Sequence, residues 1–306
     1  MSVHALVLVL AAALLHALWN VAAKRARQGG RHGAAGQGDQ LAFQLLTALA
    51  VALLWAPAGL WVSVGELPRW GAEAWAVVLL SAAVHLAYFS ALLTGYAKAD
   101  LTVVYPLARG SGPLLSAFAA VLLLGERPGW LGWTGLAAIV LGLLLITGLL
   151  RRKPLTPAVA AGVRWGLLTG ALIASYTVID AWAIKRLQLH PLAFDYWCNL
   201  LRIPLLLPFV WRLAVPGSVV SGWRAERRAV LLIGACSPMA YVLVLWALQT
   251  APLSAVAPAR ECSMLFAALL GGQLLKEGDR AARLLGAGAI AVGVALLGLT
   301  STGSPS

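Results

Sequence analysis

Charged residues and cysteines are both scarce in this chain. Only 11% of the 306 residues are Asp, Glu, Lys or Arg, whereas 61% are hydrophobic and the mean hydropathy is +0.85. Water-soluble domains carry about 25% charged residues, so this composition excludes a protein that covers its whole surface with water-binding groups. The sequence therefore predicts an integral membrane protein.

The three cysteines, Cys198, Cys236 and Cys262, each lie within an apolar run, and none is spaced as CxxC. This usage argues against a disulfide framework and against a metal site, and no cofactor is expected. A GxxxxGK[ST] loop for nucleotide binding is also missing from the sequence. The sequence therefore predicts no nucleotide-driven activity that uses such a loop.

Acidic residues are few, at 11 against 23 Lys and Arg, and the formal net charge is +12. Such a balance can indicate nucleic-acid binding, but the basic residues lie in short loops between hydrophobic runs and form no basic face interleaved with aromatic residues. We expect no nucleic-acid partner. The anionic headgroups of the lipid bilayer are the expected partners of these charges.

Long apolar runs are what the sequence has in abundance. A membrane-spanning helix needs about 20 mostly apolar residues, and ten runs approach this length. The predicted fold class is therefore an all-α membrane protein with ten transmembrane helices. The runs lie near residues 3–23, 40–62, 74–95, 101–124, 130–150, 162–184, 193–213, 229–249, 254–275 and 281–300.

An internal repeat divides these runs into two sets. "AKADLTVVYPLARGSGP" and "LQTAPLSAVAPARECSM" share the order hydroxyl, valine, proline, arginine, and Glu126 and Glu277 each follow at a helix end. "GLAAIVLG" (135–142) and "GAGAIAVG" (286–293) then keep the same glycine-to-glycine spacing. The sequence predicts a first five-helix unit over residues 1–150, a linker over 151–157, and a second five-helix unit over 158–306.

Because five is odd, the second unit enters the membrane from the opposite side, and the two repeats have inverted topology. Inverted repeats are typical of secondary transporters, which bind solute near the membrane midplane beside discontinuous helices. Pro106 and Pro258 mark the fourth and ninth helices as the ones predicted to be interrupted.

At these residues the chain resembles the drug/metabolite transporter superfamily, in its EamA-domain branch. The resemblance rests on the two repeats, the P-x-x-R and P-A-R-E starts of the fourth and ninth helices, the acid closing each, and the segment "HALWNVAAKR" (16–25). It implies a multi-pass protein of the bacterial cytoplasmic (inner) membrane. Some relatives accompany phosphonate-utilisation genes and others export amino acids. Proton coupling, a homodimer and the orientation of the termini are left open.

Two arginines stand at matching places in the repeats, Arg109 and Arg260, and Glu261 follows the second. An arginine at the bilayer centre costs at least about 2.5–3.5 kcal/mol, so each must face water, an acid or backbone carbonyls. Solute contact or gating and a purely structural ion pair are equally compatible with this pattern. We expect Arg260 to be held by acids in a gating or structural network, and Arg109 to be freer to meet solute.

Arg202 has no counterpart in the first repeat, where Leu46 takes the matching place. With Asp195 and Asn199 it forms one polar helical face, and its guanidinium suits a carboxylate or phosphonate. Snorkelling to the membrane interface is the structural alternative. We predict that Arg202 and Asn199 contact the solute.

The remaining candidates are spaced by one helical turn, which places each set on one helix face. His16 can exchange protons near neutral pH, and Asp180 is a deep acid; both are predicted to serve coupling or gating, together with Arg260 and Glu261. The histidines can equally well hydrogen-bond a neighbouring helix. The candidate solute contacts among these residues are Trp19, Asn20, His85, Tyr88, Tyr176 and Tyr241. The sets are His16, Trp19 and Asn20; His85 and Tyr88; Tyr176 and Asp180; and, alone, Tyr241.

The leading functional hypothesis is a secondary-active transporter of a small polar metabolite working by alternating access. Three intramembrane arginines against two deep acids favour an anionic or zwitterionic, amino-acid-like solute. A membrane-embedded enzyme using His16, His85 and Asp180 is an alternative, although the histidines form no HExxH set. An accessory membrane subunit is the third possibility, but it would have no need for paired intramembrane arginines.

Overall fold

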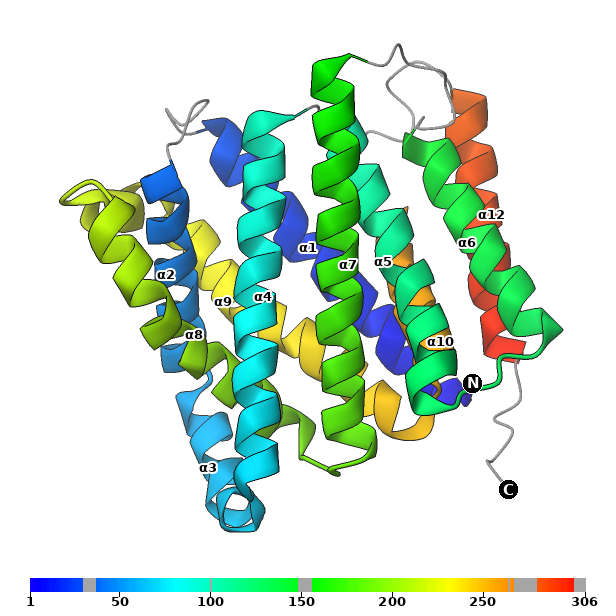
Figure 1. The fold of residues 1–306 in the computed structure, drawn as a ribbon, viewed down its shortest axis with the longest axis horizontal. Coiled ribbons are helices and arrows are strands. Elements are labelled where there is room, and N and C mark those ends of the chain that lie inside the picture. The colour runs from blue at the N-terminus through cyan, green and yellow to red at the C-terminus, as the bar shows by residue number, and fades with distance from the viewer. Residues whose placement is uncertain (30–36, 100, 148–155, 264, 267–279, 300–306) are drawn as a thin grey trace.

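A computed structural model of the chain describes residues 1–29, 37–99, 101–147, 156–263, 265–266 and 280–299. Within these ranges the regular secondary structure is entirely helical (Figure 1). The first half holds α1 (Val3–Gly29), α2 (Gln37–Leu54), α3 (Ala56–Glu66), η1 (Leu67–Arg69), α4 (Ala72–Lys98), α5 (Leu101–Leu124) and α6 (Trp130–Thr147). The second half holds α7 (Pro157–Lys185), α8 (Pro191–Leu213), α9 (Ser218–Thr250), α10 (Leu253–Ala259), η2 (Arg260–Cys262) and α12 (Arg280–Leu299).

Four helical segments in the described residues are long and apolar enough to cross a membrane, namely Ala72–Leu92, Leu107–Leu124, Val159–Lys185 and Ser218–Thr250. A fifth is added if the pair Gly38–Leu54 and Ala56–Arg69, which meets at 67°, forms one span. The apolar segments Val3–Trp19, Trp130–Leu145 and Leu284–Leu299 are shorter. The chain is thus a multi-pass membrane protein, and the number ten stays a prediction.

The second apolar run, expected near residues 40–62, is not a straight helix. Helix α2 ends at Leu54 and α3 begins at Ala56, with Pro57 in its first turn. Proline lacks a backbone N–H and is tolerated at such a position, where no intrahelical bond is lost. The indole of Trp55 donates from Nε1 to the carbonyl of Gly234 on α9 at 3.1 Å, which ties the bend to the second half.

Helix α5 runs without a break from Leu101 to Leu124, so the predicted interruption at Pro106 is wrong. A proline near a helix start removes one N–H but keeps a helical φ, and the helix can continue through it. In the second half, α10 ends at Ala259, one residue after Pro258, and the chain tightens into the 3₁₀ turn η2 at Arg260. The two repeats therefore differ in their backbone at matching sequence positions.

The two halves interlock instead of standing side by side. The most extensive helix contacts join a helix of the first half to one of the second: α5 with α7, α6 with α12, α1 with α9, and α4 with α7. Figure 1 shows α1 and α9 crossing behind α4 and α7. A single apolar core includes Val9 and Ile139 from the first half and Leu245 and Ile290 from the second.

Helices α6 and α12 pack through glycines in a reciprocal way. A Cβ on Gly135 would lie 2.9 Å from the carbonyl oxygen of Gly293, and a Cβ on Gly293 would lie 2.6 Å from that of Gly135. A Cβ on Gly142 would lie 2.5 Å from the carbonyl oxygen of Gly286. Residue number rises on one helix as it falls on the other, so the helices are antiparallel. Glycine permits this close approach in membrane helices.

One end of the molecule, here named the terminal face, carries both Met1 and Gly298, whose amino group and carbonyl oxygen lie 3.3 Å apart. On this face Glu126 follows α5 and accepts hydrogen bonds from the backbone N–H of Leu253 at 2.7 Å and Ser254 at 2.8 Å. Lys185 Nζ, at the end of α7, lies 3.4 Å from Glu126 Oε1. A carboxylate there satisfies the free N–H groups of the α10 start. We call these contacts the Glu126 clasp.

The opposite end, here named the linker face, is where α6 ends and α7 begins (Figure 1). The linker residues 151–155 and the acid Glu277, which the sequence pairs with Glu126, lie outside the described residues.

Gly142→Val tests the α6–α12 contact. The added methyl groups meet the Gly286 carbonyl and Ile290, so overpacking should destabilise the protein by about 1–3 kcal/mol and lower its melting temperature in detergent. Gly288→Val is the matched control, because nothing lies within 4 Å of a Cβ at that position. Equal melting temperatures for the two variants would contradict the contact.

Candidate functional site

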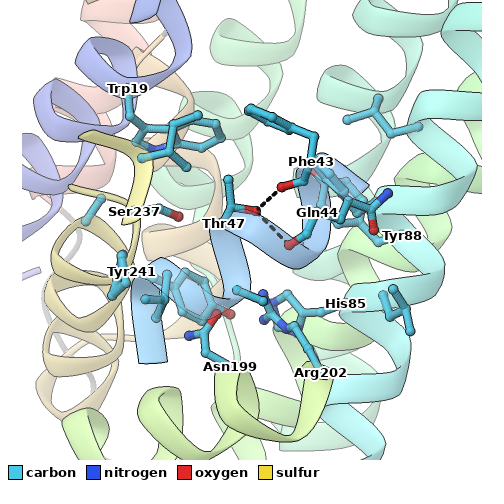
Figure 2. A pocket seen from close by; sticks show the side chains of 18 of the residues that line it. Trp19, Phe43, Gln44, Thr47, His85, Tyr88, Asn199, Arg202, Ser237 and Tyr241 are labelled. Atoms are coloured by element: carbon cyan, nitrogen blue, oxygen red, sulfur yellow. Dashed lines mark hydrogen bonds between the residues drawn. The ribbon is translucent and has the colours of Figure 1, made fainter. Parts of the chain in front are cut away.

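A cavity of about 340 Å³ lies between the two halves. Its walls come from α1, α2, α4 and α5 of the first half and from α7, α8, α9 and η2 of the second (Figure 2). The volume falls within the range of about 300–1,000 Å³ usual for small-molecule sites. The cavity is therefore large enough for a metabolite of modest size.

The cavity reaches from the linker face toward the middle of the molecule. Asp39 and Ser218 line it near the starts of α2 and α9, and Leu92 lines it toward the end of α4, which are all linker-face ends (Figure 1). Val51 and Asp195 line it at greater depth. The Glu126 clasp lies beyond them, at the terminal face. The cavity lining thus extends toward the linker face, and the Glu126 clasp lies on the opposite side.

The carboxylate of Glu261 lies between the two repeated arginines. Arg109 Nη1 lies 3.4 Å and 3.5 Å from its two oxygens, and Arg260 Nε lies 3.9 Å from Oε1. Arg109 Nη2 also donates to His16 Nε2 at 2.9 Å. Glu261 is only 1% exposed. One buried acid therefore compensates two guanidinium groups that come from different halves of the chain.

The expectation that Arg109 is the freer arginine is wrong. Arg109 makes the closer contact with Glu261 and adds a hydrogen bond to His16, whereas the Nε of Arg260 is buried without a hydrogen-bond partner in the described part of the chain. The asymmetry follows from η2, because the tight turn carries Glu261 toward α5 and away from its sequence neighbour. Both arginines line the cavity.

A second buried acid, Asp180 on α7, is held by two hydroxyl groups. Ser81 Oγ on α4 donates to its Oδ1 at 2.5 Å, and Tyr241 on α9 donates its hydroxyl hydrogen to Oδ2. His85 Nε2 lies 3.8 Å from the same carboxylate. Asp180 is fully buried behind the cavity wall, so it can exchange a proton with His85 without itself touching solute.

Aromatic rings form one wall of the cavity. His85 stacks on Tyr176 with ring centroids 3.9 Å apart, and Tyr241 meets His85 edge-on at 5.6 Å. Tyr88 meets Tyr176 at 5.4 Å. On another side, Trp19 packs edge-on against His16 at 4.8 Å. These rings offer apolar faces for the carbon skeleton of a solute.

Helix α8 contributes a polar stripe formed by Asp195, Asn199 and Arg202. Asn199 Nδ2 donates to the carbonyl oxygen of Asp195 at 2.8 Å and to its carboxylate at 3.0 Å. Arg202 projects toward His85 (Figure 2), and its Nε is buried without a hydrogen-bond partner among the described residues. The stripe therefore offers one carboxylate and one guanidinium to the cavity.

Most of the residues predicted from the sequence meet at this cavity. His16, Trp19, His85, Tyr88, Arg109, Tyr176, Asn199, Arg202, Tyr241 and Arg260 line it. Asp180 and Glu261 lie behind its wall, and the side chain of Asn20 lies outside the described residues. In the part of the chain that the structure describes, no group of three His, Cys, Asp or Glu side chains could hold a metal ion.

Sequence reasoning missed the contribution of α2. Phe43, Gln44 and Thr47 line the cavity together with Ser237 on α9 (Figure 2). A signal was present, because Gln40, Gln44 and Thr47 recur at helical spacing within an otherwise apolar run. The bend after Leu54 sets the angle at which α2 presents this face.

Glu261→Gln tests the shared ion pair. Removing one member of a buried ion cluster costs about 3–5 kcal/mol because the remaining charges are uncompensated, so the variant should lose most of its folded yield. Arg109→Ala and Arg260→Ala should both lower the yield as well. Glu66→Gln is the control, since its partner Arg69 is 76% exposed. Gel-filtration recovery in detergent measures the yield; normal recovery of Glu261→Gln would contradict the pairing.

Comparison with known proteins identifies relatives of this chain. The chain is 40% identical over 68 residues to the Spermidine export protein MdtI of Shigella flexneri, and 38% identical over 68 residues to that of Escherichia coli strain K12 / DH10B. Each match covers 22% of this chain and 62% of the relative. A solved structure described as "Crystal structure of protein" has the same fold, with a TM-score of 0.72 at 17% identity over 97% of this chain and 96% of that one. The model of the EamA-like transporter family matches residues 4–148 and 160–299. The chain therefore belongs to the EamA-like transporter family.

Proposed function

We propose that the protein is a secondary-active transporter that moves a small polar metabolite across the membrane by alternating access. The observation that carries this proposal is the cavity itself, which both halves line and which the buried Arg260 and the partly buried Arg109 and Arg202 face. Buried guanidinium groups in a membrane protein mark solute or ion pathways. Membership of a transporter family favours this function over a membrane-embedded enzyme.

The architecture we propose is two inverted five-helix repeats, over residues 1–150 and 158–306, joined by the linker 151–157. The antiparallel glycine contact of α6 with α12 supports it, as does the presence of Met1 and Gly298 at one face. The family model also matches the chain in two stretches. The four long segments, the bent pair and the three shorter apolar helices would make eight spans, and ten require α8 and the predicted run at 254–275 to cross the membrane as well. The bacterial origin of the relatives supports the inner membrane as its location.

The solute we propose is amino-acid-like, either anionic or zwitterionic, with its acid group on Arg202. The cavity wall holds hydrogen-bond donors for which the described residues provide no acceptor, including Arg202 Nε and Trp19 Nε1. A buried donor without an acceptor costs about 1–3 kcal/mol, so a solute rich in acceptor oxygens fits. Spermidine, named for the relatives, carries only donors when protonated, so it offers no acceptor to Arg202.

The other site residues divide between solute contact and coupling. Tyr88, Tyr176, Tyr241, His85, Trp19, Asn20, Asn199 and Arg109 are the proposed companions of Arg202. His16, Asp180, Arg260 and Glu261 are the proposed coupling or gating groups, with Asp180 and His85 placed to relay a proton. Opening the terminal face would require the Glu126 clasp to separate, because it ties α5 to α10 and α7 there.

Arg202→Gln tests the solute site. Loss of a charge-assisted hydrogen bond of about 1.5–3 kcal/mol should lower transport about tenfold or more, while the protein still folds. Uptake of radiolabelled amino acids and 2-aminoethylphosphonate into proteoliposomes with an imposed pH gradient measures it. Arg212→Gln, in the exposed last turn of the same helix, is the control. Wild-type uptake by Arg202→Gln would return Arg202 to a structural role.

A further inference from the structure

Asp195 is a buried carboxylate that faces the cavity without a cationic partner. It is 3% exposed and lines the cavity on α8. Its one hydrogen bond comes from the neutral amide of Asn199 at 3.0 Å. Across the described residues, no Lys, Arg or His side chain lies within ion-pair distance of it. This contrasts with Glu261, which two arginines compensate.

Arg202 presents the opposite charge; it is partly buried and has no ion-pair partner among the described residues. It lies seven positions after Asp195, two helical turns along the same face, which is about 10.5 Å of helix rise. Both side chains line one cavity. They do not pair with each other, since no ion pair joins them within the part of the chain that the structure describes. Two charges of opposite sign, neither held in an ion pair within the described residues, thus stand at separate points of one solute site.

We propose that the transported solute is a zwitterion whose ammonium group binds Asp195 while its acid group binds Arg202. This inference rests on the proposed function and narrows its substrate class. A buried charge is costly unless it is paired and hydrogen-bonded, and a zwitterion compensates both charges at once. A simple anion leaves Asp195 uncompensated, and a polyamine leaves Arg202 uncompensated.

The space between the two charges suits the body of such a solute. The stacked pair His85 and Tyr176 and the ring of Tyr241 line the cavity beside the α8 stripe. Aromatic faces attract both apolar carbon and cationic groups. Asn199 lies between the two charges on the helix, and its hydrogen bonds to Asp195 fix the carboxylate in place. Asp195 thereby becomes a specificity-determining residue.

The test compares zwitterions with the acids that lack their amino group. Four matched pairs are alanine and propionate, glutamate and glutarate, phenylalanine and 3-phenylpropionate, and 2-aminoethylphosphonate and ethylphosphonate. Binding is measured by the thermal shift of the purified full chain, and uptake by proteoliposomes. We expect the zwitterion of at least one pair to bind about tenfold more tightly than its acid, the value of one charge-assisted hydrogen bond.

Asp195→Asn should abolish this preference while leaving the affinity for the acid unchanged, and Asp195→Glu should keep part of the preference. Glu73→Gln, an exposed acid in the first turn of α4, is the control and should bind like the wild type. If Asp195→Asn does not fold, the preference of Asp195→Glu and of the wild type still decides the matter.

Three results would overturn the inference. Acids binding as tightly as their zwitterions would leave the proposed transporter standing and remove the role of Asp195. Equal weakening of acids and zwitterions by Asp195→Asn would assign the carboxylate to a coupling proton or cation. Preservation of the zwitterion preference in Asp195→Asn would exclude Asp195 from recognition. Failure of every pair to bind or to be transported would instead contradict the proposed function itself.

Discussion

A charge buried within a membrane protein must be compensated, and the Glu261 carboxylate does this for two guanidinium groups at once. An uncompensated arginine at the bilayer centre costs at least about 2.5–3.5 kcal/mol. Arg109 comes from α5 and Arg260 from η2, so the shared acid joins the two halves at the cavity. The two arginines and His16 then give the cavity part of its polar surface.

Two contacts between the halves differ in character. The glycine contact of α6 with α12 is backbone against backbone and leaves no room for sliding. The Glu126 clasp is made of charge-assisted hydrogen bonds near the surface, where Lys185 is 26% exposed. Water can replace such bonds, and helix dipole contacts of this kind are worth about 0.3–1 kcal/mol when exposed. The rigid contact and the exchangeable one suit a molecule in which one half rocks against the other.

Much of the architecture could be predicted from the sequence, because apolar length and helical periodicity are local properties. The runs at residues 74–95 and 162–184 correspond to helices α4 and α7, and the paired arginines predicted a polar interior. The bend at Trp55 and the continuity of α5 through Pro106 were missed, since a single proline permits either outcome. The pairing of Arg109 with Glu261 spans 152 positions. It depends on how η2 turns, which no local pattern in one sequence reveals.

Alternating access to one cavity is the central claim, and cysteine labelling from the two sides tests it most directly. The natural cysteines would be replaced, and single cysteines placed at Thr47 in the cavity, at Ser2 on the terminal face and at Thr156 on the linker face. A membrane-impermeant maleimide is then applied to vesicles of either orientation. We expect Ser2→Cys and Thr156→Cys each to react from one side, opposite to one another, and Thr47→Cys to react from both. Reaction of Thr47→Cys only from the side that labels Thr156→Cys, under every condition, would contradict the account.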